Sequence, residues 1–91
     1  MTSRDVVLRD RYGLHPRAAR RIQDALKEYA SSVTVESLEG GSPPVDARGM
    51  LALISSGIRA GERVRITADG PDEAEVLASL GDLLEAGVDH P

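Results

Sequence analysis

Two residues near the amino terminus could carry out chemistry together, the imidazole of His15 and the guanidinium of Arg17. His15 follows a turn that contains Gly13 and directly precedes Pro16, which suits the first position of a helix. The first amides of a helix have no intrahelical partners and the helix dipole is positive there, so this position favours an anion. Arg17 can hold two phosphate oxygens at once. Together the two residues indicate a site for a phosphoryl group.

His15 can also be the group that reacts. A neutral imidazole is a competent nucleophile near pH 7, because its unperturbed pKa is about 6.5. Attack on a phosphoryl donor would place the new negative charge where the first-turn amides and Arg17 point. The position is equally compatible with His15 as a mere helix cap. The other histidine, His90, is next to the last residue, where we expect a tail over about residues 88–91.

The rest of the sequence argues against most other chemistries. The chain has no cysteine, so it can form neither a disulfide nor a thiolate metal site. It shows no HExxH pair, no serine with a supporting base and no nucleotide-binding glycine loop. We therefore expect no metal and no cofactor. A nucleic-acid role is disfavoured, because the arginines lack interleaved aromatic residues and the net charge is -4.

The spacing of apolar residues predicts the elements that position His15. Spacings of three and four predict a helix directly after His15 and another near the end of the chain, whereas alternation predicts strands. The predicted elements are a strand over 4–9, a helix over 16–30, a strand over 32–38, a short edge strand at Val45, a short helix over 47–56 that starts at Asp46 or a neighbour, a strand over 63–68 and a helix from Pro71 to the stop at Gly87.

This order, β-α-β-β-α-β-α, predicts an α+β fold. We expect a four-stranded, mainly antiparallel sheet with three helices packed on one face. With 91 residues the chain should form a single domain over 1–91, with a core of Val, Leu, Ile and Ala. A domain of this size has no separate substrate-binding half, so any chemistry must occur on one exposed spot.

Charge is distributed unevenly along the chain. Residues 1–21 carry six arginines and two aspartates, whereas residues 69–89 carry seven acids and no base. Such asymmetry indicates either a charged partner or a solvated mixture of surface charges. The first residues lack the apolar run of a signal peptide, and no stretch approaches the ~20 apolar residues of a membrane span. We expect a cytoplasmic protein without membrane insertion.

The run Gly13-Leu14-His15-Pro16-Arg17-Ala18-Ala19 resembles GLHxRPA, the phosphorylation-site motif of the HPr family. HPr is the histidine-containing phosphocarrier of the bacterial phosphoenolpyruvate-dependent sugar phosphotransferase system. The resemblance continues along most of the chain. It includes Val33-Thr34-Val35, Asp46-Ala47-Arg48, Ser55-Ser56-Gly57 and, at the entry to the last helix, Ala68-Asp69-Gly70-Pro71-Asp72-Glu73.

The resemblance implies an open-faced β-sandwich and a phosphoryl carrier that is not itself an enzyme. Because such a carrier must meet two partners through one face, we expect a monomer. His15 would be phosphorylated on Nδ1 by enzyme I and would pass the group to enzyme IIA domains of sugar permeases. Arg17 would bind the phosphate. The short second helix would supply an apolar docking patch of Met50, Leu51 and Ile54, of which at least one could instead fill the core. Arg20 and Arg21 would face an acidic partner surface.

Two departures from the family pattern carry consequences. The family has proline after the arginine, whereas here Ala18 follows Arg17 and the proline has moved to Pro16. Pro16 offers no N–H, so we expect the amides of Arg17 and Ala18 to cradle the phosphoryl group. Members under serine-kinase control carry a serine where this chain has Gly49. Without that hydroxyl, we expect no regulatory phosphoserine.

The residues fit two alternative functions as well. One is an HPr-like domain of another phosphorelay, such as a dihydroxyacetone kinase or a nitrogen-related system. The other is a regulatory binding module that has kept the fold and lost phosphoryl transfer. Retention of both His15 and Arg17 argues against the second alternative, and the sequence is equally consistent with several sugars or relay branches.

Overall fold

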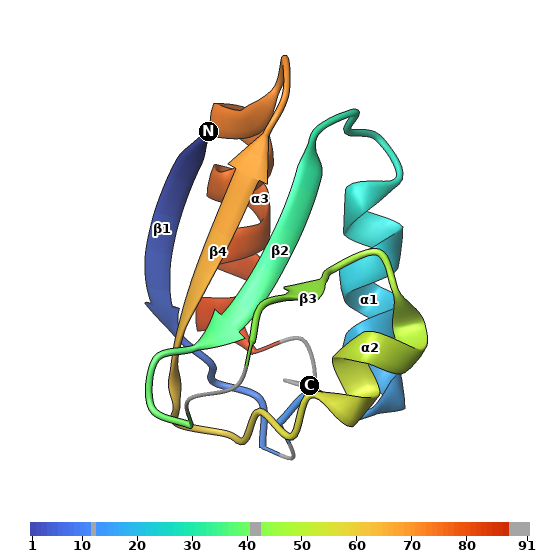
Figure 1. The fold of residues 1–91 in the computed structure, drawn as a ribbon. Helices are drawn as coiled ribbons and strands as arrows, with labels where there is room; N and C mark the ends of the chain where they lie inside the picture. Colours follow the sequence, from blue (N-terminus) through green and yellow to red (C-terminus); the bar gives the residue numbers. More distant parts are fainter. Residues whose placement is uncertain (12, 41–42, 88–91) are drawn as a thin grey trace.

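The computed structural model describes residues 1–11, 13–40 and 43–87. Its elements follow the predicted order (Figure 1). They are β1 (Thr2–Val7), α1 (Pro16–Leu26), β2 (Ser32–Ser37), β3 (Val45–Asp46), α2 (Met50–Ser55), β4 (Arg63–Asp69) and α3 (Glu73–Ala86). The tail with His90 lies outside the described residues.

The four strands form one antiparallel sheet in the order β1-β4-β2-β3. Val6 pairs with Val64 and Val35 pairs with Ile66, and all four side chains are buried. Charged and hydroxyl side chains occupy the alternate positions, so one face of the sheet is covered and the other meets solvent. β3 lies at the edge of the sheet, as the two prolines before it predict. The open-faced arrangement is confirmed.

The helices pack on the apolar face of the sheet (Figure 1). The predicted core of Val, Leu, Ile and Ala is confirmed, because these four types supply all of its buried apolar side chains. α1 contributes Ala18, Ala19, Ile22 and Leu26, and α3 contributes Val76, Leu77, Leu80 and Leu84. Burial of these stripes holds α1 in place, and with it the residue that precedes the helix.

α1 is shorter than the predicted helix over 16–30. It ends at Leu26, and the amides of Lys27 and Tyr29 then donate to the carbonyl groups three residues earlier. The guanidinium of Arg48 donates to the carbonyl oxygens of Leu26, Tyr29 and Ser31 at 2.9, 2.8 and 2.9 Å. These carbonyl groups therefore bond a side chain from another part of the chain, and the apolar spacing through Tyr29 could not show that competition.

The prediction that α2 starts at Asp46 or a neighbour is wrong. Asp46 belongs to β3, and its carboxylate accepts a hydrogen bond from the amide of Arg48 at 2.9 Å. The amide of Ala47 donates to the carbonyl of Val33 in β2 at 2.9 Å, so this residue is still bound to the sheet. The helix begins only after Gly49, which offers no side-chain cap.

Part of the uneven charge is used inside the fold. β1 lies beside α3, and Arg4 in β1 forms ion pairs with Asp82 and Glu85 of α3 at 3.1 and 3.2 Å. The amino-terminal ammonium group also pairs with Glu73 at 3.0 Å. The basic beginning of the chain and its acidic end are therefore partly complementary to each other. None of the described helices is both long and apolar enough to cross a membrane.

Candidate functional site

His15 is the N-cap of α1. Its backbone is extended, with φ -79° and ψ 174°, and its carbonyl accepts the first helical bond, from the amide of Ala19 at 2.9 Å. Its side chain is half-buried, and Nδ1 accepts a hydrogen bond from the amide of Arg17 at 3.2 Å. The capping role that the sequence left open is therefore present. The cap uses the same nitrogen atom that the family resemblance assigns to phosphorylation, so the two roles are compatible.

This contact shows which nitrogen atom of the neutral His15 imidazole carries the proton. A nitrogen atom that accepts a hydrogen bond carries a lone pair, so the proton of the neutral imidazole is on Nε2. Nδ1 therefore holds the nucleophilic lone pair and faces the amino-terminal end of α1. A phosphoryl group on Nδ1 would lie beside the positive end of the helix dipole and its first amides.

The loop before His15 packs against residues 57–61. The amide of Leu14 donates to the carbonyl of Ile58 at 3.3 Å. Gly13 is buried, with φ +72°, and a Cβ atom there would lie 2.5 Å from the carbonyl oxygen of Ile58 and 3.1 Å from Cα of Arg59. The approach excludes any side chain at this position, and it fixes where the His15 imidazole emerges from the fold.

Arg17 and Ala18 occupy the first turn of α1. The side chain of Arg17 is exposed, whereas Ala18 is buried. Pro16 is the first residue of the helix and has no N–H, so the amide of Arg17 is the first one that reaches His15. The amide of Ala18 comes next. The amide after it, of Ala19, already donates to the carbonyl of His15.

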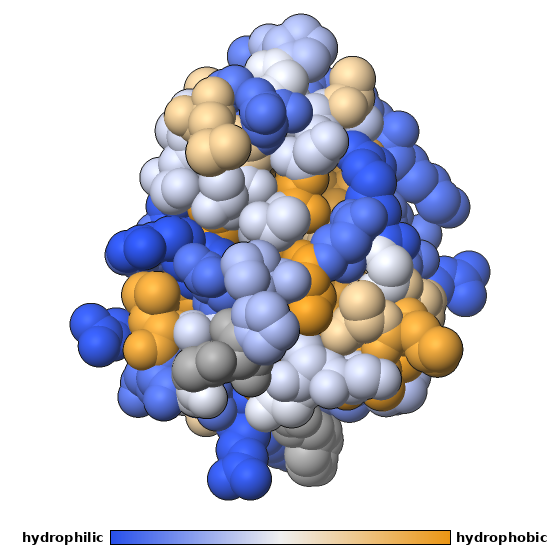
Figure 2. Space-filling view, in the orientation of Figure 1, coloured by the Kyte–Doolittle hydropathy of each residue, from blue (hydrophilic) through white to orange (hydrophobic). Residues whose placement is uncertain are grey.

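The predicted docking residues lie on two neighbouring helices. Arg20 and Arg21 are exposed on α1, and Arg20 lies 3.9 Å from Asp24. On α2, Leu51 is 77% exposed and Ile54 is 37% exposed. Figure 2 shows apolar atoms gathered over α2. The amide nitrogen of the Gln23 side chain in α1 donates to the carbonyl of Arg48 at 2.8 Å, which ties α1 to the entry of α2.

Met50 differs from the other two apolar residues of α2. It is half-buried and packs against the core, whereas Leu51 and Ile54 point outward. The alternative that one of the three fills the core therefore applies to Met50. Gly49 is the N-cap of α2, and no side-chain hydroxyl is present there.

The sequence alone does not reveal that Arg48 and Asp72 hold distant backbone segments in position. The Asp72 carboxylate accepts hydrogen bonds from the amides of Ala30 and Ser31 at 2.8 and 3.0 Å and from the Ser31 hydroxyl. These bonds lower the pKa of Asp72, and the bond from the Ser31 hydroxyl has the largest effect. Asp72 thereby joins the segment after α1 to the start of α3. No local pattern signals either role, because the partners are distant in sequence.

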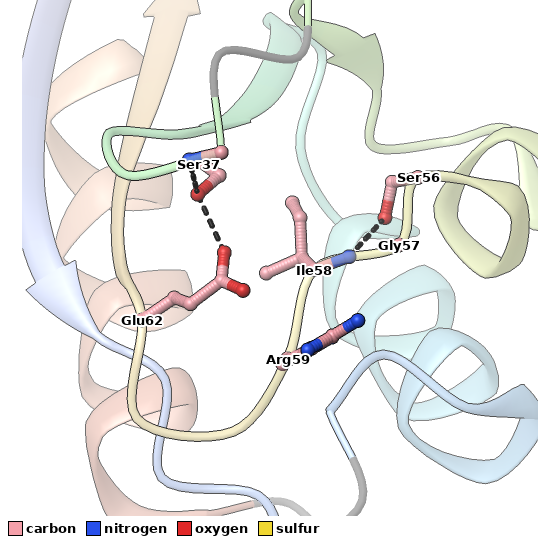
Figure 3. Close-up of a pocket in the computed structure, with 7 residues that line it drawn as sticks. Ser37, Ser56, Gly57, Ile58, Arg59 and Glu62 are labelled. Atoms are coloured by element: carbon pink, nitrogen blue, oxygen red, sulfur yellow. Dashed lines mark hydrogen bonds between the residues drawn. The ribbon is translucent and has the colours of Figure 1, made fainter.

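One pocket lies apart from His15, which does not line it. It has a volume of about 380 Å³ and lies between residues 37–40 and the segment 56–62, with Arg59 and Glu62 on its lining (Figure 3). Its serine hydroxyls hold the surrounding loops, since Ser37 donates to Glu62 at 2.6 Å and Ser56 accepts from the amide of Ile58 at 3.3 Å. No cluster of three or more potential metal ligands occurs among the described residues.

Comparison with known proteins points to one family. The model of the "PTS HPr component phosphorylation site" family matches residues 2–86. The chain is 33% identical over 86 residues to the multiphosphoryl transfer protein of Salmonella typhimurium. The matched segment covers 94% of this chain but only 23% of that protein. The chain is 30% identical over 87 residues to the phosphocarrier protein NPr of Proteus mirabilis, covering 96% of this chain and 94% of that protein.

Solved structures agree. HPr-C-His from Thermoanaerobacter tengcongensis has a TM-score of 0.84 and 28% identity, with 94% of this chain and 93% of that chain covered. An HPr dimer from the same organism has a TM-score of 0.67 and 28% identity, with 94% and 95% covered. The match spans nearly all of the described fold and includes His15 at the start of α1. The chain therefore belongs to the HPr family of phosphocarriers of the phosphotransferase system.

Proposed function

We propose that this chain accepts a phosphoryl group on Nδ1 of His15 from phosphorylated enzyme I and passes it to enzyme IIA domains of sugar permeases. The observation that carries the proposal is the contact between Nδ1 and the amide of Arg17 at 3.2 Å. It places the lone pair of the imidazole at the positive end of α1, beside amides that a phosphoryl oxygen can take over.

The transfer step needs little from the protein beyond these groups. Nδ1 attacks the phosphorus atom of the donor phosphohistidine, the bond between phosphorus and the donor nitrogen breaks, and a new bond between phosphorus and Nδ1 forms. The amides of Arg17 and Ala18 and the Arg17 guanidinium stabilise the dianionic product. The group stays accessible because Arg17 is exposed and His15 is only half-buried. The next acceptor attacks the same phosphorus atom in the second transfer.

Docking would use the exposed residues of the two neighbouring helices. Leu51 and Ile54 present an apolar patch on α2, and Arg20 and Arg21 present positive charge on α1. An apolar contact surrounded by charge suits a transient complex, because charge complementarity speeds the encounter and the small apolar area limits its lifetime.

The test is transfer from labelled phosphoenolpyruvate through enzyme I, with the product analysed by mass spectrometry under non-acidic conditions. We expect phosphate on His15, and none on a folded His15→Ala variant. No phosphohistidine on this chain, when another HPr is labelled in parallel, would contradict the proposal. A kinase-dependent phosphate on α2, at Ser55 for example, would contradict the separate expectation that Gly49 removes serine-kinase control.

A second candidate is a different relay of the same chemistry, such as a dihydroxyacetone kinase or a nitrogen-related system. It is favoured by the relatives themselves, which include NPr proteins, and by multiphosphoryl transfer proteins of which this chain spans 23%. Phosphoryl transfer from phospho-His15 to purified acceptors separates the two. Faster transfer to a sugar-specific IIA domain supports the first proposal, and faster transfer to a dihydroxyacetone kinase subunit supports the second.

A further inference from the structure

Arg59 is set apart from most arginines of this chain by what it contacts. Five others have partners within the chain, either carboxylates or backbone carbonyl groups: Arg4, Arg20, Arg48, Arg63 and Arg65. Arg59 is exposed, and its side chain forms no ion pair or hydrogen bond within residues 1–11, 13–40 and 43–87. Among the residues that the structure describes, its positive charge therefore has no partner.

The acid nearest to Arg59 in sequence is held elsewhere. Glu62 accepts a hydrogen bond from the Ser37 hydroxyl at 2.6 Å. Figure 3 shows the guanidinium of Arg59 extending toward Gly57 and away from the Glu62 carboxylate. Arg59 therefore forms no ion pair with the acid of its own loop.

The backbone of Arg59 lies directly against the loop that presents His15. Its Cα atom would be 3.1 Å from a Cβ atom on Gly13, and the preceding carbonyl, of Ile58, accepts the amide of Leu14. Gly13 is two residues before His15, and two residues of chain span at most about 7 Å. A group on His15 is therefore within reach of a long cationic side chain that starts at Arg59.

From this placement we infer that Arg59 is a second phosphate-binding residue, which contacts the phosphoryl group of phospho-His15. Arg17 and the first-turn amides approach that group from the start of α1, and Arg59 approaches it from the loop over 57–61. The inference deepens the proposed function and rests on it. A second guanidinium offsets the dianionic charge of the product, which complements the loss of one amide donor at Pro16.

The experiment uses phosphorylated protein made without any partner. In a His90→Gln background, His15 is the only histidine. Phosphoramidate transfers its phosphoryl group to the imidazole, so its own bond between phosphorus and nitrogen breaks and ammonia leaves. Titration by ³¹P NMR at low ionic strength then reports the pKa of the phosphoryl group. A cation in contact with that group lowers this pKa, because it favours the dianion.

We expect Arg59→Ala to raise the pKa of the phosphoryl group by about 0.5 unit, with partial recovery in Arg59→Lys. The matched control is Arg65→Ala, which removes an arginine from the solvent-facing side of β4 and should leave the value unchanged. An unchanged pKa in a folded Arg59→Ala variant, or an equal rise in Arg65→Ala, would overturn the inference. Because phosphoramidate needs no enzyme I, failure of enzymatic labelling would count against the proposed function and leave this result intact.

Discussion

At the scale of single residues, one nitrogen atom links the fold to its chemistry. Nδ1 of His15 caps α1 through the amide of Arg17, and the proposed transfer uses the same atom as its nucleophile. In the proposed transfer, forming phosphohistidine would exchange this weak cap for stronger, charge-assisted bonds to phosphoryl oxygens. The proposal gives the Arg17 side chain a separate role, in which its exposed guanidinium would bind the same oxygens.

Arg17→Ala keeps the backbone amide and removes the guanidinium. We expect the rate of phosphoryl transfer to fall about 10- to 100-fold, the effect of losing one or two charge-assisted hydrogen bonds. Arg17→Lys should fall between this variant and the unmodified chain, because an ammonium group cannot hold two oxygens in fork geometry. The measurement is rapid-quench transfer from phosphorylated enzyme I. Equal rates for all three proteins would remove Arg17 from the mechanism.

Gly13→Ala tests the support behind His15. A Cβ atom would lie 2.5 Å from the carbonyl of Ile58 in a backbone with φ +72°. We expect a loss of about 2–4 kcal/mol in the free energy of unfolding, the sum of the left-handed backbone cost and overpacking. Gly61→Ala is the control, since its φ is +87° but nothing lies within 4 Å. It should lose only about 1 kcal/mol. Equal losses in urea denaturation would show that the contact with Ile58 is unimportant.

At the scale of elements, α1 is fixed at both ends by different means. Its amino-terminal end is capped by His15, and its last carbonyl groups bond the guanidinium of Arg48, which precedes α2. A cation at this end also complements the helix dipole. Since α2 carries the exposed Leu51 and Ile54, the same arginine sets the relation between the helix that starts at His15 and the helix that offers the apolar patch.

Arg48→Met removes these bonds and keeps an aliphatic side chain of similar length. We expect the free energy of unfolding to fall by about 2–3 kcal/mol, because three carbonyl groups lose a charged donor. Arg63→Met is the matched control. Its ion pair with Glu39, at 3.8 Å, is between exposed groups and should contribute at most about 1 kcal/mol. If the two variants unfold at the same urea concentration, the bonds from Arg48 to the end of α1 do not stabilise the fold.

At the scale of the whole molecule, charge has two separate uses. One joins distant parts of the chain, as in the group of Thr2, Glu73 and the amino-terminal ammonium at one end of the sheet. The other belongs to the proposed docking surface, on the exposed arginines of α1. The simple contrast between a basic beginning and an acidic end could not separate these uses, because it does not show which charges meet.

Stability should decline in acid through Glu73. Hydrogen bonds from the Thr2 hydroxyl, then from the amino-terminal ammonium and the Gly70 amide, lower its pKa from 4.5 to about 2. A lowered carboxyl pKa contributes stability that is present above the unfolded value and is lost as the pH falls toward the folded value. We therefore expect stability to decrease between about pH 5 and pH 2, and Glu73→Gln to flatten this decrease.

The control for this prediction is Glu75→Gln, in the same helical turn. Glu75 forms no ion pair or hydrogen bond with the described part of the chain. Urea denaturation at several pH values measures the slope for each variant. A slope unchanged by Glu73→Gln, or changed equally by Glu75→Gln, would show that Glu73 is not the group responsible.

Transfer should also weaken with salt. If the exposed arginines of α1 meet an acidic donor surface, the association rate should fall several-fold between about 0.05 and 0.5 M ionic strength. Stopped-flow or rapid-quench transfer from phosphorylated enzyme I measures this rate. Arg20→Ala with Arg21→Ala should reduce the dependence, whereas Arg65→Ala on the far side of the sheet should not. A rate that is insensitive to salt would contradict electrostatic steering.

The order of the elements, the burial of the apolar stripes and the candidate site could be predicted because each depends on neighbouring residues. Alternation decides which face of β4 is buried, and a glycine turn before His15 and Pro16 decides where α1 begins. The end of α1 and the start of α2 could not be predicted in the same way. Both depend on Arg48 and Asp46, whose bonds reach across the fold or replace a helical turn.

By itself, the sequence determined that His15 would stand at the start of a helix, and it made this side chain the candidate phosphoryl acceptor. These follow from residue type and local spacing. Only the tertiary structure decided that Met50 turns inward while Leu51 turns outward, and that Arg59 lies beside Gly13. Each of these depends on contacts between segments far apart in the chain, and such contacts arise only once the helices pack on the sheet.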